Sequence, residues 1–600
     1  MYKSKNESNV RMILLFLLTF VPLIVYGHSY SSGLGKYLWF GAEKQDDFFL
    51  FYKMCAVLVI SGAMLCVIIV QFWKEELRVK MGKKEWIQFA AIGLFAGLTF
   101  VSTITSKYSK VGMWGGYDMF ESVWVILGYA VITLYAFLYV SNNTHRKMVM
   151  SSLAIVSGII GVIGTFQFLG FDFYQSSFMS TILSASVGKE IKMALESLHS
   201  YASLYNPNYL GVFCVLVIPV MISMVLESKK MKEKIAYSSV VLLLLISLVG
   251  SQSKTGIVVL ALLLLLMLFF ERRRIVENKV LLGLFVVIFV LMVGLVVWRG
   301  ENFIQQMKNV FSIEKTEAIG WDSMKTTKDH VELCYGGVRF NVSLDNDTDD
   351  INEMLQITYE DGTPCDVSIY GDGTATLYIT PKGEKMQLLQ MKYGYVTETE
   401  KGFLFDNPLA SYLFILQDGT YKLYRGEEKA GSIDTTKIEK THFMDGYEKL
   451  FSGRGYIWKR TMPLLKNDIL LGSGQGSFVY EFPNDDYAEN TKYGCYGQII
   501  TKPHNIFLQM ATQSGVLGML LCVFAWLFYI IFSVRNNFRG DRGVNASIGI
   551  MIGIMGYVLM GFLNDSSITV APIFWMLLGI GMRQNCEMYE HTKNEEKQAK

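Results

Sequence analysis

The strongest constraint on this chain of 600 residues is a series of apolar runs, each close to twenty residues long. A run of that length is what an α-helix needs to cross the hydrocarbon core of a bilayer. About half of the residues are hydrophobic (51%) and only 18% are charged, which fits membrane spans better than several soluble domains. The sequence therefore predicts a mainly α, polytopic membrane protein.

The apolar runs predict about twelve transmembrane helices. They lie near 12–26, 48–72, 86–104, 121–141, 149–169, 208–227, 236–250, 255–270, 279–298, 505–533, 545–562 and 567–583. The first run could also be a signal peptide, but no small-x-small cleavage site clearly follows it. We therefore count it as a span.

Basic residues distinguish one set of loops from the other. Cytoplasmic loops carry an excess of Lys and Arg, and here the excess falls on every second loop: Lys74, Arg78, Lys80, Lys83, Lys84, Arg146, Lys147, Lys229, Lys230, Lys232, Lys234, Arg272, Arg273, Arg274, Arg535, Arg539 and Arg542. Both termini are therefore expected in the cytoplasm. The expected order is helices 1–9 in 1–299, a large extracytoplasmic loop at 300–503, helices 10–12 in 504–583, and a cytoplasmic tail at 584–600.

The large loop contains a segment, 325–435, with strand-like alternation and turn dipeptides. Asp361-Gly362, Gly371-Asp372-Gly373 and Asp418-Gly419 each follow a short β-prone run. Such dipeptides between alternating runs are hairpin signals. The segment predicts a small all-β domain, a sandwich or a partial barrel, inserted before a helical part at 440–503.

Composition also limits the ligands. A net charge of +2 predicts no nucleic-acid partner, and the eight cysteines form no C-x-x-C pair or Cys/His cluster that would bind zinc. No Asp-x-Asp pair or His/Asp cluster at an outer loop clearly demands a metal, so we expect neither a metal nor another cofactor. A disulfide between Cys334 and Cys365 is the less favoured of two alternatives, because their geometry is not given by the sequence.

The stretch 501–508 (Thr-Lys-Pro-His-Asn-Ile-Phe-Leu) joins the polar loop to the tenth span. Pro503 suits the first position of a helix, which would put His504 in the first turn at the membrane surface. The helix dipole disfavours an imidazolium there, so a neutral His504 could accept a proton. A histidine that only anchors the helix end is the alternative.

Other outer segments offer groups for an anionic or polar ligand. Asn206 and Asn208 flank Pro207 and could cap a helix or present amides. Lys254 follows Ser251-Gln252-Ser253 at a helix N-terminus, where it either accompanies a bound anion or snorkels to the interface. Further candidates are Arg454, Arg460, and the glycine loop 472–476 with Gly474 and Gly476, whose N–H groups could converge on an anion. No Walker lysine or dinucleotide motif accompanies that loop.

Taken in order, these segments resemble the O-antigen ligase and Wzy-type polysaccharide polymerase family. The resemblance rests on four pieces: 206–208, 251–254, 453–458 with 471–478, and 504–505 followed by Leu508 and Gly515. It covers most of the membrane part and both ends of the large loop, but not 325–435. Family members usually carry arginine in the Ser-x-Ser turn, whereas this chain has Lys254, which keeps the charge and loses the planar fork.

The resemblance implies a helical membrane glycosyltransferase, similar to the GT-C type. Such enzymes move a glycan from a polyprenyl diphosphate to a glycan or cell-wall acceptor outside the membrane. By this likeness His504 would assist the acceptor hydroxyl, and Lys254 and Arg454 would hold the diphosphate. Asp565, on the last outer turn, could orient the histidine, bind the acceptor or cap a helix.

Two other classes fit less well. A transporter or lipid flippase also has about twelve spans, but no embedded acidic pair or internal repeat is evident. A sensor that uses the β domain as receptor would lack a sizeable cytoplasmic output domain. Ligase and polymerase share the donor chemistry, so the sequence does not choose between them.

Overall fold

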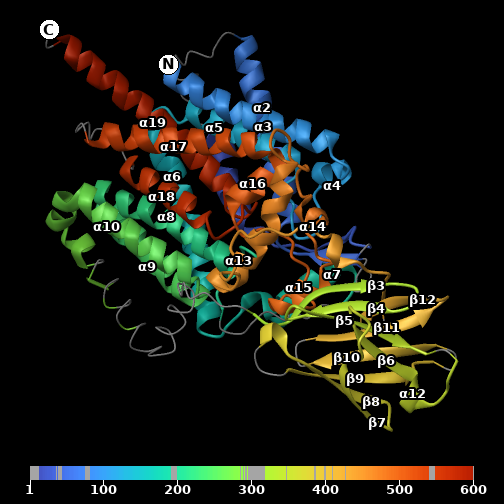
Figure 1. The fold of residues 1–600 in the computed structure, drawn as a ribbon. Coiled ribbons are helices and arrows are strands. Elements are labelled where there is room, and N and C mark those ends of the chain that lie inside the picture. The colour runs from blue at the N-terminus through green and yellow to red at the C-terminus, as the bar shows by residue number, and fades with distance from the viewer. Residues whose placement is uncertain are drawn as a thin grey trace.

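The computed structural model describes most of the chain in several stretches. These are 12–35, 37, 44–74, 81–190, 199–283, 286–287, 290, 294, 318–345, 347–383, 387–397, 400–407, 410–425, 428–538 and 547–598. Figure 1 shows two parts, a large body of helices and a smaller β domain.

The helical body contains the membrane-type helices. Its helices are α2 (Phe51–Trp73), α3 (Lys83–Thr105), α4 (Ser109–Trp114), α5 (Val123–Tyr139), α6 (Asn143–Phe168), α7 (Ser177–Val187), α8 (Pro207–Glu227), α9 (Met231–Ser251), α10 (Lys254–Glu277), α13 (Leu450–Thr461), α14 (Phe478–Glu481), α15 (Tyr487–Lys492), α16 (Ile506–Ser514), α17 (Val516–Phe538), α18 (Ser547–Met560) and α19 (Ala571–Gln598). In the described residues, seven helices are long and apolar enough to cross a membrane, and four apolar helices are shorter. The mainly helical class is confirmed, whereas the count of twelve spans is not established.

Consecutive long helices run in opposite directions, which separates the two ends of the body. At one end, α6 and α9 finish together, where Ser200 N donates to Gly250 O over 3.0 Å. α8 starts at the same end, because Gly211 lies against Ser253, the cap residue of α10. We call this the 504 end, since His504 lies there, and the other the far end. Among the described basic loop residues, Arg146, Lys147, Lys229 and Lys230 lie together at the far end.

The β domain is built from two antiparallel sheets. One contains β3 (Trp321–Thr326), β4 (Val331–Tyr335), β5 (Val338–Leu344) and β6 (Leu355–Tyr359); the other contains β7 (Asp366–Tyr370), β8 (Thr374–Ile379), β9 (Gln387–Tyr395), β10 (Lys401–Asn407), β11 (Ala410–Gln417), β12 (Thr420–Arg425) and β13 (Glu428–Gly431). Neighbouring strands follow each other in sequence, as hairpins require. A two-stranded ribbon, β1 (His28–Ser31) with β2 (Lys44–Asp47), lies outside this domain.

Aromatic side chains join the two sheets into one core. Trp321 of the smaller sheet lies 5.2 Å from Phe405 of the larger one, measured between ring centroids. The domain is tied to the helical body through α15, where Tyr412 Oη donates to Tyr487 O over 2.7 Å and Lys492 pairs with Asp322 at 2.6 Å. Cys334 and Cys365 are both free thiols. The β domain is therefore held to the polar segment that leads to His504.

Three expectations about helix boundaries need correction or fall outside the structure. The run 505–533 is two helices, because Gly515 breaks it between α16 and α17. α19 starts in the last apolar run and continues without interruption to Gln598, through the expected tail. The predicted span 279–298 lies largely outside the described residues.

The break at Gly515 has a steric cause. Its φ is +88°, and a Cβ there would lie 2.6 Å from Leu470 O. Val516 N and Leu517 N donate to Asp468 O and Ile469 O, so carbonyl groups of the polar segment satisfy the first N–H groups of α17. Only glycine fits this backbone without strain.

We expect Gly515→Ala to lower the stability by about 1–3 kcal/mol, because it adds a strained φ and a clash with backbone. The measurement is thermal unfolding in detergent, followed by tryptophan fluorescence. Gly97→Ala is the control, since this helical glycine has open space around it and should gain up to about 1 kcal/mol. Equal unfolding temperatures for the two variants would contradict this account.

Candidate active site

His504 and Asp565 form the centre of the candidate site. His504 Nδ1 lies 2.9 Å from Asp565 Oδ2; the histidine side chain is 44% exposed and the aspartate side chain only 1%. An ionised carboxylate only accepts hydrogen bonds, so Nδ1 is the donor of this pair and Nε2 is the ring nitrogen left free of Asp565. The pair thus presents an oriented imidazole to solvent.

His504 does not lie in a helix, which corrects the expectation from Pro503. It has a φ of +50° and precedes Asn505, whose side chain caps α16 by accepting from Phe507 N and Leu508 N. The helix dipole is therefore not what positions the imidazole, which the neighbouring carboxylate orients instead.

Backbone contacts fix the loop of His504 against the loop of Asp565. Ile506 N donates to Gly561 O over 2.8 Å, and Asn505 Nδ2 donates to Phe562 O over 3.0 Å. On the other side, Trp458 Nε1 donates to Pro503 O over 3.0 Å. Helix α13 and the α18–α19 loop therefore both position the histidine.

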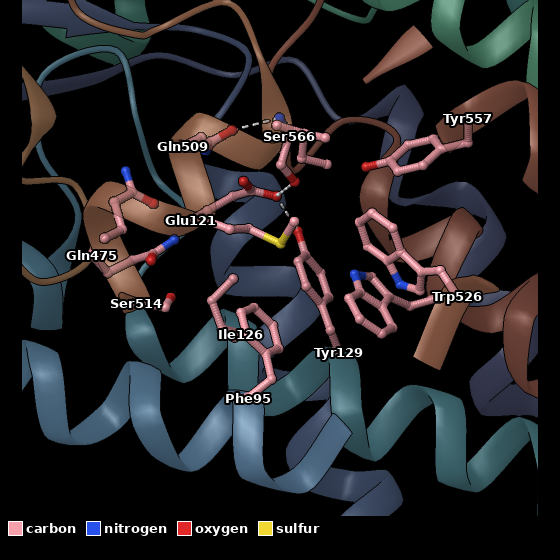
Figure 2. A pocket seen from close by; sticks show the side chains of 14 residues that line it. Phe95, Glu121, Ile126, Tyr129, Gln475, Gln509, Ser514, Trp526, Tyr557 and Ser566 are labelled. Atoms are coloured by element: carbon pink, nitrogen blue, oxygen red, sulfur yellow. Dashed lines mark hydrogen bonds between the residues drawn. The ribbon is translucent and has the colours of Figure 1, made fainter. Parts of the chain in front are cut away.

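The loop of Asp565 is also held from within the helical body (Figure 2). Ser566 Oγ and Tyr129 Oη donate to Glu121 Oε1 over 2.9 and 2.6 Å, and Ser566 N donates to Gln509 Oε1 over 2.7 Å. These groups line a cavity of about 30 Å³, room for water-sized molecules only. This network restrains the residue next to Asp565 without reaching a substrate.

Lys502 is the buried cation of the site. Its Nζ lies 3.2 Å from both Asp118 Oδ2 and Tyr209 Oη, and its side chain is 6% exposed. Burial alone would lower the pKa of Lys502, but Asp118, Tyr209 and Asp565 raise it above its usual value. Lys502 therefore stays charged, and Asp118 neutralises most of that charge.

Arg454 is the half-buried cation next to Asp565. Three residues of positive φ, Phe451, Ser452 and Gly453, precede it, and its Nη1 donates back to Phe451 O over 3.1 Å. Its Nε has no hydrogen-bond partner in the described part of the chain. Burial lowers the pKa of Arg454, while Asp565 partly offsets that effect. Donors of this guanidinium are thus left for another ligand.

The other expected ligand groups at the 504 end have local roles. Asn206 caps α8 by accepting from Asn208 N over 2.8 Å, and so places Tyr209 next to Lys502. Lys254 is the first residue of α10 and is half-exposed. Within the described stretches, it forms no hydrogen bond or ion pair with His504 or Arg454.

The glycine loop does not hold its N–H groups open for an anion. Gly472 N, Ser473 N, Gly474 N and Gln475 N donate to Ser102 Oγ, Thr512 O, Gln513 O and Thr103 Oγ1. A Cβ on Gly474 would lie 2.8 Å from Ser106 Cβ, and Gly476 has a φ of +71°. Gly472 and Gly474 let this loop pack closely against α16 and α3, which corrects the expected ligand role of Gly474; the role expected of Gly476 stays a prediction.

Arg460 is likewise not available to a substrate. It is 1% exposed and pairs with Asp486 at 2.8 Å, and its Nη1 donates to Glu439 O over 3.2 Å. It stabilises the polar segment between the β domain and α16. Its expected role as a diphosphate ligand is therefore corrected.

Asp118 and Lys502 were not expected at the site. The signal for Lys502 is a cation two residues before His504 where an apolar helix follows; Asp118 is the one acid in the aromatic loop 105–120. Among the described residues, no group of three His, Cys, Asp or Glu side chains is placed to hold a metal ion.

We expect Lys502→Met to lower the stability by roughly 3 kcal/mol, because it leaves Asp118 buried without its cation. Thermal unfolding in detergent measures this. Lys107→Met is the matched control, since the Lys107–Glu481 pair of 2.9 Å is exposed on the lysine side and should contribute about 1 kcal/mol or less. Similar losses in both variants would show that burial of the Lys502 pair is unimportant.

The comparisons with known proteins bear on this region. Residues 408–523 match the family model described as O-antigen ligase. The matched segment contains Arg454, the glycine loop and His504, and it begins inside the β domain, further upstream than the motifs indicate. No curated protein and no solved structure matches the chain. The motifs and the family model agree: over residues 408–523 the chain is similar to the O-antigen ligase family.

Proposed function

We propose that this protein transfers a glycan from a polyprenyl-diphosphate carrier to a saccharide or cell-surface acceptor at the outer face of the membrane, without a metal. The observation that carries the proposal is the exposed imidazole of His504, held at Nδ1 by the buried Asp565. The family match to O-antigen ligases supports the reaction class, a step in surface polysaccharide synthesis. The 504 end is then the outer end.

In the proposed reaction, His504 Nε2 takes the proton of the acceptor hydroxyl. That oxygen forms a bond to the anomeric carbon of the donor glycan, and the bond between this carbon and the diphosphate oxygen breaks. The polyprenyl diphosphate leaves with the electron pair. Asp565 keeps the imidazole in the tautomer that accepts at Nε2 and stabilises the imidazolium that forms.

The leaving diphosphate gathers negative charge, so positioned cations lower the barrier. Arg454 is the first candidate for this role, because its planar fork is half-buried near Asp565 and has an unpaired Nε. Lys254 is the second candidate, because it stands half-exposed at the start of α10 on the same end. Lys502 is already paired with Asp118, so it would act on the diphosphate through its electrostatic field and not by contact.

We expect His504→Ala to lower kcat by about 10²–10⁴-fold, the usual contribution of a general base. The assay is transfer by purified protein reconstituted with a polyprenyl-diphosphate glycan. Asp565→Asn should also lower kcat, with little change in KM, since Asp565 is buried. His330→Ala, in the β domain, is the control. Unchanged transfer by folded His504→Ala protein would end the proposal of a catalytic base.

We expect Arg454→Gln and Lys254→Gln each to weaken donor binding by roughly 10–100-fold, the range for hydrogen bonds to charged groups. Binding of the lipid diphosphate to purified protein measures this. Arg454→Lys should restore only part of the affinity, because it keeps the charge and loses the fork. Full affinity in the double glutamine variant would place the diphosphate elsewhere.

The same reconstitution separates the remaining functional classes. Lengthened lipid-linked chains identify a polymerase, and glycan on a different acceptor identifies a ligase. Translocation of intact donor without transfer identifies the alternative, a flippase for lipid-linked oligosaccharides.

A further inference from the structure

A second polar pocket lies at the far end of the helical body. It has a volume of about 270 Å³ and is formed by the start of α6, the end of α8 and the start of α9. Its lining side chains include Arg146, Lys147, Glu227, Lys229, Lys230 and Glu233. Since α8 runs from the 504 end to this pocket, the two sites are a helix length apart, roughly 30 Å.

The pocket carries more positive than negative groups. Lys147 pairs with Glu233 at 2.8 Å, and Arg146 pairs with Glu587, outside the pocket lining, at 2.7 Å. Lys229 and Lys230 are both exposed at the rim, and Glu227 also lines the pocket. The lining therefore carries four cations and two carboxylates, and Glu587 is a third carboxylate, paired with Arg146.

Two features point to an anion. Arg146 is only 5% exposed, and its Nε has no hydrogen-bond partner in the part of the chain described, although Nη1 and Nη2 both have one. Helix α9 starts at the pocket without a side-chain cap. Uncapped first-turn N–H groups and the helix dipole both favour a bound negative charge.

The apolar surface next to the pocket indicates what kind of anion binds. Met148 on α6 and Met231 and Ile235 on α9 are exposed, by 43%, 57% and 55%. Met148 and Met231 follow directly on the lining residues Lys147 and Lys230, and Ile235 lies two residues after Glu233. An anion bound here would have an apolar face beside it, as the acyl chains of a phospholipid require.

We propose that this pocket binds the phosphate headgroup of an anionic phospholipid, with the acyl chains along the exposed faces of α6 and α9. Basic pockets between helix ends at a membrane surface suit such headgroups. This end is also the one that the basic loops predict to face the cytoplasm. The proposal is independent of glycan transfer, because none of its residues lies at the 504 end.

The test is native mass spectrometry of the purified full-length protein in detergent. Phosphatidylglycerol and phosphatidylcholine with identical acyl chains are titrated separately, and inorganic phosphate is titrated alone. We expect phosphatidylglycerol to bind at clearly lower concentration than the other two. Equal binding of both lipids would overturn the charge argument, and tight binding of inorganic phosphate would overturn the lipid assignment.

A pair of double variants locates the site. Lys229→Gln with Lys230→Gln should weaken phosphatidylglycerol binding about 25-fold, since each cation removed contributes about fivefold. Lys232→Gln with Lys234→Gln removes the same charge from the same segment but outside the pocket lining, and should change binding less than twofold. Equal weakening by both would mean diffuse attraction to the loop and would overturn the pocket. Unfolding temperatures confirm that both variants are folded.

Discussion

Burial of the Asp565 carboxylate controls the arrangement of the 504 end. Burial would raise the pKa of Asp565, but His504, Lys502 and Arg454 together hold it below its usual value. Because this folded-state pKa is lowered, the contribution to stability is complete above the usual carboxyl range. It is lost only as the pH falls through the folded value. At neutral pH the ionised Asp565 is thus the centre to which the cations are drawn.

The cations near Asp565 come from separate parts of the chain, and each is held in place by its own partners. Lys502 brings Asp118, which also accepts from Thr501 Oγ1 over 3.1 Å and from Tyr205 Oη. Tyr209 reaches Lys502 because the Asn206 cap starts α8 at that point. A buried lysine is tolerated only where such partners surround it. The motif at 206–208 therefore contributes to the site by placing Tyr209 against Lys502. A direct contact with ligand is not needed to explain it.

Local patterns in the sequence predict the elements well and the pairings poorly. Runs of apolar residues and turn dipeptides report on helices and hairpins, because those signals lie within ten to twenty neighbouring residues. The Lys502–Asp118 pair joins residues nearly four hundred positions apart, and no local pattern records it. Glycines are ambiguous for a physical reason: an anion nest and a close backbone approach both require them. Gly474 serves a close backbone approach. Arg460 resembles Arg454 in sequence, but it is paired with Asp486.

The charge pattern at the 504 end bears on which cation can meet a diphosphate. A cation already matched by a buried carboxylate contributes little net charge to a ligand, since moving it would leave that carboxylate unpaired. Lys502 is in this state because of Asp118, and Arg460 because of Asp486. Arg454 differs, because its carboxylate neighbour, Asp565, also interacts with His504 and Lys502. The single negative charge of Asp565 is therefore shared among three cationic or protonatable groups. Positive charge is therefore in excess around Asp565, near Arg454 and His504. This excess is what a departing diphosphate would compensate, which makes Arg454 the better placed of the two arginines for that role.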